Sequence, residues 1–337
     1  MKNYFIISMF VLTLLVSCAE SKQDVVRVSN PPYTVVSDSI YTRMPGKLLY
    51  QNGTVYWQDP TSSENFVHAI NVRSGNEIAC FANIGQGPTD FSVVNLSLFP
   101  EGGIVLNDME KPLEIRYQVS SDKDSVISSV RKYSNDKDAT QLLYLTADRL
   151  LYLSPDKAEL FHVVDGDRSV CFGKRPIQDA IDNSFNVFQG HVSYHPQKDL
   201  LVYAALEMPY VAVYKGERGK NWNLRNEMKE HWDYTIHEGV LKFSSEVKRG
   251  AWEIALTKDC IVLLQRDSQV EGVVDREKEG RGMETIPHSL FVYDYDLKLK
   301  KIIHMPFPML RLCGDTESNT IYAMSVNPEF ELIKIDL

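Results

Sequence analysis

Six prolines mark a repeat that limits the fold of this chain more than any other feature of its sequence. Each proline follows a run of β-branched and aromatic residues and precedes a second run that alternates apolar and polar residues. Proline presets φ and has no N–H for a β ladder, so it suits a corner between two strands. The corners fall at Pro60, Pro112, Pro155, Pro209, Pro287 and Pro328.

Most of these corners are 41 to 54 residues apart, which is the repeat length of a β-propeller with about four short strands per blade. The sixth unit ends at Leu337, directly after its third strand, and the extended segment Val25–Ile40 is the expected donor of the missing outer strand. Pairing of the first strand with the last blade closes the ring and protects open sheet edges. We therefore predict an all-β fold, a six-bladed β-propeller whose last blade is closed by the N-terminal strand.

A pair of β-sandwich domains is the main alternative for a chain of this length. Two sandwiches account for the strands, but not for six corners that are each followed by the same alternating run. They also predict an N-terminal strand that stays unpaired from the last unit.

The first 24 residues predict the cellular location of the protein. Lys2 precedes an apolar run from Tyr4 to Val16, as in a secretory signal. The run leads into Leu15-Val16-Ser17-Cys18, which resembles a bacterial lipobox, where the cysteine carries the lipid. An ordinary secretory signal with a chance cysteine is the alternative, and about 13 apolar residues are few for a membrane span. We predict a signal peptide over 1–17, a lipidated Cys18 with a tether to residue 24, and one propeller domain over 25–337.

Net charge and missing motifs exclude several classes of function. The chain carries a net charge of −9, and loss of residues 1–17, with Lys2, makes it −10. So acidic a chain does not show the basic face of a nucleic-acid-binding protein. The sequence contains no GxSxG, P-loop or HExxH motif, so no known catalytic set is evident and an enzymatic role stays open.

Cysteines and histidines give no metal or cofactor prediction. Cys80, Cys171, Cys260 and Cys313 each stand among apolar neighbours and are predicted to be buried strand thiols rather than disulfides. His191 and His195 are about 13 Å apart along a strand, too far to share a metal. For His68 and His162, in the second strands of their units, we expect partly buried rings whose nitrogens are hydrogen-bonded.

One loop carries a family resemblance. Gly85, Gly87, Pro88 and Phe91 match a Gly-x-Gly-Pro-Gly-Glu-Phe loop, while Thr89 and Asp90 replace its later Gly and Glu. With the lipobox and six units, the chain resembles the TolB-like six-bladed propeller lipoproteins of Gram-negative bacteria. The resemblance implies a propeller anchored by lipid to the outer membrane, periplasmic or surface-facing, and implies no defined activity. We expect a tight turn with Phe91 packed between blades.

The segment between Pro209 and Pro287 is about thirty residues longer than the other repeats, with charged stretches over 215–248 and 266–284. The second stretch joins the two central strands of the fifth unit, so it should project from the face that bears the proline corners and the Gly85 loop. Insertions on one face of a repeat protein often form its binding rim, and a solvated hairpin is the alternative. The rim contacts that we predict are Gln86, Asp108, Lys111, Glu207 and Arg266.

The resulting prediction is a lipid-anchored, non-enzymatic propeller that binds a protein, peptide or glycan on its corner-bearing face. The alternative is an envelope hydrolase or lyase with a site in the central channel, where carboxylates and amides hold calcium. Three or more inward carboxylates and amides that converge on one point favour the alternative.

Overall fold

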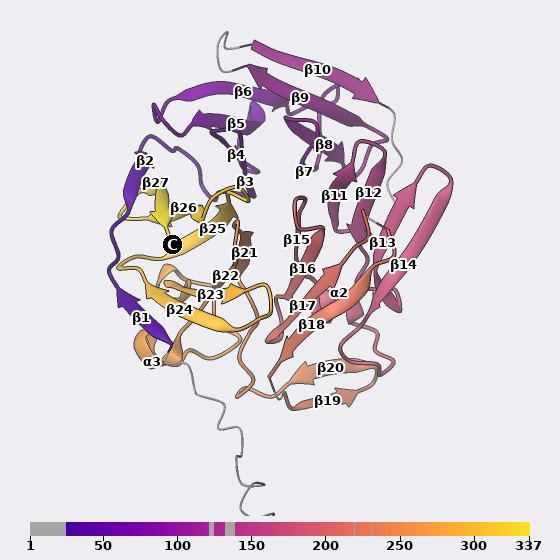
Figure 1. The fold of residues 1–337 in the computed structure, drawn as a ribbon, viewed down its shortest axis with the longest axis vertical. Helices are drawn as coiled ribbons and strands as arrows, with labels where there is room; N and C mark the ends of the chain where they lie inside the picture. Colours follow the sequence, from indigo (N-terminus) through magenta and orange to yellow (C-terminus); the bar gives the residue numbers. More distant parts are fainter. Residues whose placement is uncertain (1–24, 121–124, 132–138, 219, 231) are drawn as a thin grey trace, which may run out of the picture.

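A computed structural model describes residues 25–120, 125–131, 139–218, 220–230 and 232–337. Cys18, the predicted signal peptide and the tether lie outside the described residues. Six sheets of four or five strands surround one axis (Figure 1). The predicted six-bladed β-propeller is thereby confirmed, and the two-sandwich alternative is wrong.

Each blade is an antiparallel meander that begins at the axis and ends at the outside of the ring. Blade one holds β3 (Leu48–Gln51), β4 (Thr54–Gln58), β5 (Asn65–Asn71) and β6 (Glu77–Asn83). Blade two holds β7 (Val94–Leu98), β8 (Ile104–Asp108), β9 (Glu114–Ser120) and β10 (Ser125–Arg131). Blade three holds β11 (Gln141–Thr146), β12 (Arg149–Leu153), β13 (Glu159–Asp165) and β14 (Arg168–Lys174).

The second half of the ring continues the same order. Blade four holds β15 (Gly190–His195), β16 (Leu200–Ala205), β17 (Tyr210–Lys215) and β18 (Asn223–Lys229). Blade five holds β21 (Glu253–Leu256), β22 (Cys260–Gln265), β23 (Ser289–Asp294) and β24 (Leu299–His304). Blade six holds β25 (Met309–Gly314), β26 (Thr320–Val326) and β27 (Phe330–Asp336). The hairpin β19 (Tyr234–His237) and β20 (Val240–Phe243), the helices α2 (Ser184–Phe188) and α3 (Ser268–Glu271), and the 3₁₀ turn η1 (Met283–Thr285) lie in connections.

The apolar or polar character of each strand follows from how deeply the strand is buried. All six residues of β16 (Leu-Leu-Val-Tyr-Ala-Ala) are buried, because a central strand has a blade on each side. The outer strand β18 (Asn-Leu-Arg-Asn-Glu-Met-Lys) has no fully buried residue. Turn chemistry sets the hairpins: Asn52 and Gly53 join β3 to β4 with φ of 51° and 80°, as the two-residue turn requires.

The N-terminal segment closes the ring, as predicted. Its strand β2 (Thr34–Ser37) pairs antiparallel with β27 and becomes the outer strand of blade six. A second strand, β1 (Val26–Ser29), was not predicted and pairs parallel with β24 as a fifth strand of blade five. Innermost strands of neighbouring blades contact each other, including β25 with β3. The N-terminal segment therefore covers the edges of two blades.

All six proline corners connect the second and third strands of a blade. We call the face that they share the corner face; the Gly85 loop, which joins β6 to β7, opens on the same face because strands alternate in direction. The charged stretch 215–248 is not wholly an insertion, since it contains β18 and the hairpin β19–β20. The connection 266–288 folds back against the ring, where Asp267 pairs with Arg27 at 2.6 Å.

The cysteine prediction is partly wrong. All four described cysteines are free thiols, and Cys313 is buried, but Cys80 and Cys171 are exposed. Both exposed thiols lie on outer strands, β6 and β14, which lack a further strand on one edge.

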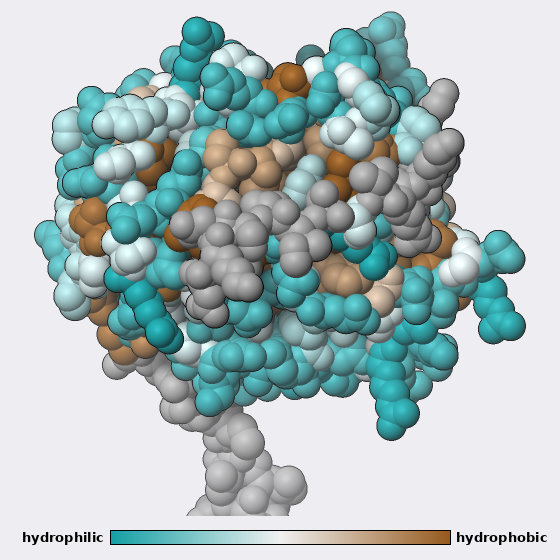
Figure 2. All heavy atoms as spheres, turned by 90° about the horizontal axis from the view of Figure 1, so that it is seen from above, coloured by the Kyte–Doolittle hydropathy of each residue, from teal (hydrophilic) through white to brown (hydrophobic). Residues whose placement is uncertain are grey.

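The described residues include no helix with the length and apolar character of a membrane span. The surface in Figure 2 is mainly hydrophilic, with hydrophobic residues in small groups.

Candidate functional site

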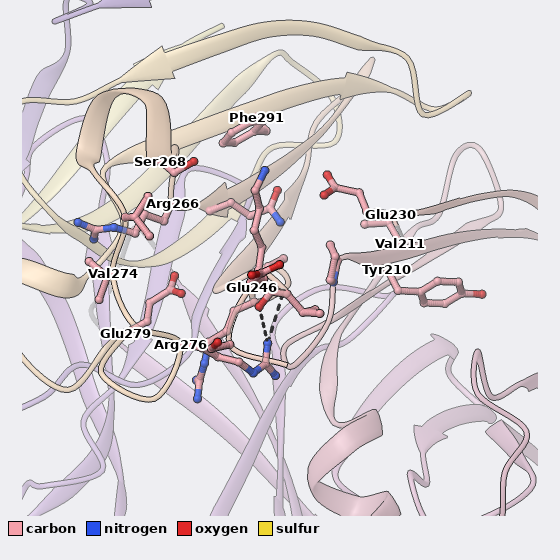
Figure 3. A pocket seen from close by; sticks show the side chains of 18 of the residues that line it. Tyr210, Val211, Glu230, Glu246, Arg266, Ser268, Val274, Arg276, Glu279 and Phe291 are labelled. Carbon is pink, nitrogen blue, oxygen red and sulfur yellow. Dashed lines mark hydrogen bonds between the residues drawn. The ribbon is translucent and has the colours of Figure 1, made fainter. Parts of the chain in front are cut away.

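A pocket of about 160 Å³ lies on the corner face between blades four and five. Its walls come from the corner at Pro209, the segment 245–251, the connection 266–279 and strand β23 (Figure 3). Tyr210, Phe291 and Tyr293 supply aromatic surface. We call it the rim pocket.

The predicted residue Glu207 pairs with two arginines that line this pocket. Its carboxylate accepts a hydrogen bond from Arg276 at 2.7 Å and lies 3.5 Å from Arg249. The Arg276 guanidinium also donates to the backbone carbonyls of Val247 and Lys248, and it stacks over Phe243 at 4.8 Å. Glu207 and Arg276 thus hold the long connection of blade five against blade four.

The predicted residue Arg266 lines the pocket itself. It donates to the backbone carbonyls of Glu271 at 2.7 Å and Gly272 at 3.2 Å, which orients the guanidinium. Its Nη1 lies 3.8 Å from a Glu271 oxygen, and no described residue accepts a hydrogen bond from this buried atom. Nε of Arg249 is likewise buried without an acceptor among the described residues. Two guanidinium nitrogens of pocket-lining residues are therefore left without acceptors, which costs stability.

Glu279 faces the same group of arginines. Burial raises the pKa of this carboxyl, against the opposing effect of Arg249, Arg266 and Arg276. A carboxyl with a raised pKa takes up a proton more readily and then competes less for a guanidinium. The lining holds four cationic side chains and three carboxylates, so the excess of positive charge is small, and it favours an acidic group on an incoming ligand.

The other predicted contacts lie across the ring, where blades one and two meet. Lys111 Nζ donates to the carbonyls of Gly85 and Asp90, at 2.9 and 3.0 Å. The Asp108 carboxylate accepts hydrogen bonds from the backbone of Ser92, Glu110 and Lys111. Gln86 is exposed. Lys111 and Asp108 therefore hold the Gly85 loop, and these residues do not meet Glu207 and Arg266.

The Gly85 loop has a packing reason for its glycines. The Asp90 carboxylate accepts from the Gly87 amide at 2.8 Å, and a Cβ on Gly85 or Gly87 would stand 2.6 Å from that carboxylate. Phe91 is fully buried in a cluster that blades one and two share. The loop is a tight turn between blades.

The central channel does not present a calcium set. Among the described residues that line it, Glu253 is the one carboxylate, and His191 lies 2.9 Å from it. Side-chain amides of Gln51, Gln58 and Gln141 hydrogen-bond backbone groups of the next blade. Calcium takes six to eight oxygen ligands, so these residues do not fit it.

One group of possible metal ligands occurs among the described residues, on the outer edge of blade one. A ligand atom from each of His68, Glu77 and Cys80 lies within 4.8 Å of the others. His68 Nδ1 is already 2.6 Å from Glu77, and its ring stacks on Trp57. In blade three, His162 lies 3.1 Å from Cys171 and stacks on Tyr152. Nε2 of both rings is buried without a partner among the described residues. Each ring therefore has a partner at Nδ1 but not at Nε2, whereas the sequence predicts hydrogen bonds at both nitrogens.

Comparison with known proteins supports the fold. No protein-family model and no curated sequence matches the chain. A member of the DUF4221 family from Bacteroides vulgatus superposes with a TM-score of 0.57 at 11% identity, over 90% of this chain and 94% of that chain. Regucalcin from Agrobacterium tumefaciens, a calcium-binding protein, superposes with a TM-score of 0.53 at 9% identity, over 93% and 95% of the two chains. At these identities the likeness concerns the fold alone.

Proposed function

We propose that this protein is a lipid-anchored cell-envelope propeller that binds a protein or peptide partner through an acidic side chain seated in the rim pocket. One observation carries the proposal: Nη1 of Arg266 and Nε of Arg249 are buried at the pocket without acceptors among the described residues. A partner carboxylate would supply the missing acceptor. The propeller fold suits such a role, because it presents a rigid rim for binding.

The rim pocket is tested with matched peptides. Full-length protein in detergent is titrated with fluorescent peptides that carry Glu, and with the same peptides carrying Gln. A charge-assisted hydrogen bond to a guanidinium is worth about 1.5 to 3 kcal/mol, so the acidic peptides should bind at least about tenfold more tightly. The double variant Arg249→Gln, Arg266→Gln should lose that preference.

Arg225→Gln is the matched control, because Arg225 pairs with Asp296 on the exposed outer surface, away from the pocket. It should leave peptide affinity unchanged. Equal affinity of wild type for the Glu and Gln peptides would contradict the proposal, as would a loss caused equally by Arg225→Gln.

The lipid anchor is tested separately. Cys18→Ser removes the atom that would carry the acyl chains, so the variant should leave the membrane fraction, whereas Cys80→Ser, at an exposed free thiol, should remain in it. Fractionation of cells followed by immunoblotting measures both. Persistent membrane association of Cys18→Ser would show that lipid is not the anchor.

The described channel residues argue against the alternative of a calcium-dependent enzyme. Regucalcin is described as a calcium-binding protein, but the described channel residues here include one carboxylate and two cationic side chains. That donor set disfavours a divalent cation.

A further inference from the structure

The central channel holds a cavity of about 570 Å³. Its walls come from the innermost strands of the blades together with Trp252. Cavities of roughly 300 to 1,000 Å³ with a few convergent polar groups are typical ligand sites. The channel is separate from the rim pocket, with which it shares no lining residue.

Charged side chains gather at the end of the channel that opens on the corner face. His191 lies near the start of β15, Glu253 begins β21, and Arg311 lies near the start of β25. Lys47 immediately precedes β3, where its carbonyl accepts a hydrogen bond from the amide of Gln58 beside the first proline corner. Four blades thus bring their charges to one level of the channel.

Lys47 is the exceptional member of this group. Its ammonium nitrogen is buried, and no described residue accepts a hydrogen bond from it. Burial lowers the pKa of Lys47 to about 8, although Glu253 acts to raise it, so the side chain is still mostly protonated at pH 7. An unpaired buried charge is costly, and an anion in the channel would offset that cost.

The neighbouring charges leave room for an added anion. Glu253 is already engaged by His191 at 2.9 Å. Burial raises the pKa of Glu253, but His191 and Arg311 overcome this effect, so the pKa lies below its ordinary value and the carboxylate stays ionised. Lys47 and Arg311 therefore present two positive charges against one negative charge.

The rest of the wall is largely aromatic and apolar. Tyr50 and Tyr194 are partly exposed and line the channel toward the opposite face, along with leucines and prolines, while Phe99 and Tyr144 are buried behind this wall. Aromatic side chains offer large flat contact surfaces to a ring-bearing ligand. A ligand with one charged end and one apolar end fits this division of the wall.

We propose that the central channel binds a small organic anion whose carboxylate draws the Lys47 ammonium out of its buried position to donate a hydrogen bond, at the end of the channel that Arg311 also lines, and whose aromatic or apolar body lies against Tyr50 and Tyr194. The site goes beyond the rim-pocket function and does not depend on it.

The test uses two ring compounds of the same shape, naphthoate and its neutral amide, naphthamide. Each is titrated calorimetrically into the full-length protein in detergent. The wild type should bind naphthoate about tenfold more tightly than naphthamide. Lys47→Met should abolish that preference while naphthamide affinity changes little, and Lys229→Met, at an exposed lysine of β18, should behave as wild type.

A pH series adds a readout that a structural role for Lys47 would not produce. Naphthoate stays ionised from about pH 7 to about pH 10, while Lys47 loses its proton above about pH 8. The charged groups that line the channel together with Lys47 are Glu253 on β21, His191 on β15 and Arg311 on β25. Naphthoate affinity of the wild type should fall about tenfold over this range, and that of Lys47→Met should stay flat.

Three outcomes would overturn the proposal: equal affinities for naphthoate and naphthamide in wild type, an undiminished preference in Lys47→Met, or a flat pH series in wild type. Displacement of naphthoate by inorganic phosphate at equal concentration would overturn the part that the ring body plays. The double variant Arg249→Gln, Arg266→Gln should bind naphthoate normally, so failure of the channel site and failure of the rim pocket are distinguishable.

Discussion

At the scale of single residues, the chain keeps several charged groups in places where they lower stability. Lys47 is the clearest case, because its ammonium is buried without an acceptor among the described residues. The pKa of this group is lowered from its ordinary value of 10.5 to about 8. Residues that lower stability in this way are common where a protein binds a ligand.

Lys47→Met should therefore stabilise the ligand-free protein at pH 7. Between about pH 8 and 10.5 the unfolded chain holds the lysine proton and the folded chain does not, so wild-type stability should rise with pH in this window. The rise is about 3 kcal/mol at most. The full penalty remains below about pH 8. Urea unfolding at pH 7 and pH 10 measures the effect.

In that experiment Lys47→Met should lose the part of the pH dependence that Lys47 causes. Lys229→Met serves as the control, since Lys229 is exposed on an outer strand. An identical rise in wild type and Lys47→Met would show that other groups cause it.

Contacts between single residues are the hardest feature to predict from sequence. The sequence indicates Glu207 because it stands near a corner, and Arg266 because it lies in a long connection. Arg249 and Arg276 were missed, because one lies outside both the corner and that connection and the other is one of many charges inside it. Their roles depend on Glu207, with which both pair only in the folded ring.

At the scale of elements, the N-terminal segment carries the closure of the ring. Strand β1 adds to blade five, where Arg27 contacts Asp267 at 2.6 Å and the Asn30 amide donates to the His304 carbonyl at 2.8 Å. Strand β2 adds to blade six through pairs such as Val35 with Ile333. One short segment therefore protects two edges that would otherwise be open.

Stepwise truncation should separate these two contributions. Removal of residues 1–30 takes away β1 and the Arg27 contact. We expect a loss of about 2 kcal/mol in the free energy of unfolding, which lowers Tm by about 5 °C, since 1 kcal/mol corresponds to about 2 to 4 °C in a large domain. Removal of residues 1–38 also takes away β2 and should lower Tm by at least about 10 °C. Differential scanning calorimetry measures both changes.

The longer truncation should also promote association between molecules, because the edge of β27 becomes available for pairing. Light scattering detects it, with the shorter truncation as the control. Equal Tm values for the two truncations would mean that β2 adds nothing to ring closure.

Elements with strong local signals were predicted well. The proline corners located the second and third strands of every blade, because proline chemistry and β-branched runs act within a few residues. Strand β18 stayed hidden inside a charged stretch, since an outer strand exposed to solvent has little apolar pattern. Strand β1 stayed hidden because its partner β24 is more than 270 residues away in sequence.

At the scale of the whole molecule, the ring creates two separate places for ligands. The rim pocket lies between two blades, and the channel lies where the inner strands of all blades meet. Closure of the ring produces the channel, whereas the rim pocket forms where two consecutive blades pack together. The net charge of −9 does not predict the rim pocket or the channel, because the few cationic side chains that line them are outnumbered by the acidic residues of the chain.

Sequence alone determined the number of blades, the corner positions, the closing strand and the short turn at Gly85, because each depends on local backbone chemistry or on a repeat length. Tertiary structure alone decided which charges meet. Lys47 and Glu253 are 206 positions apart, and only ring closure brings both to one end of the channel. Their burial, and with it the shift in the pKa of Lys47, arises from what the other blades place around them.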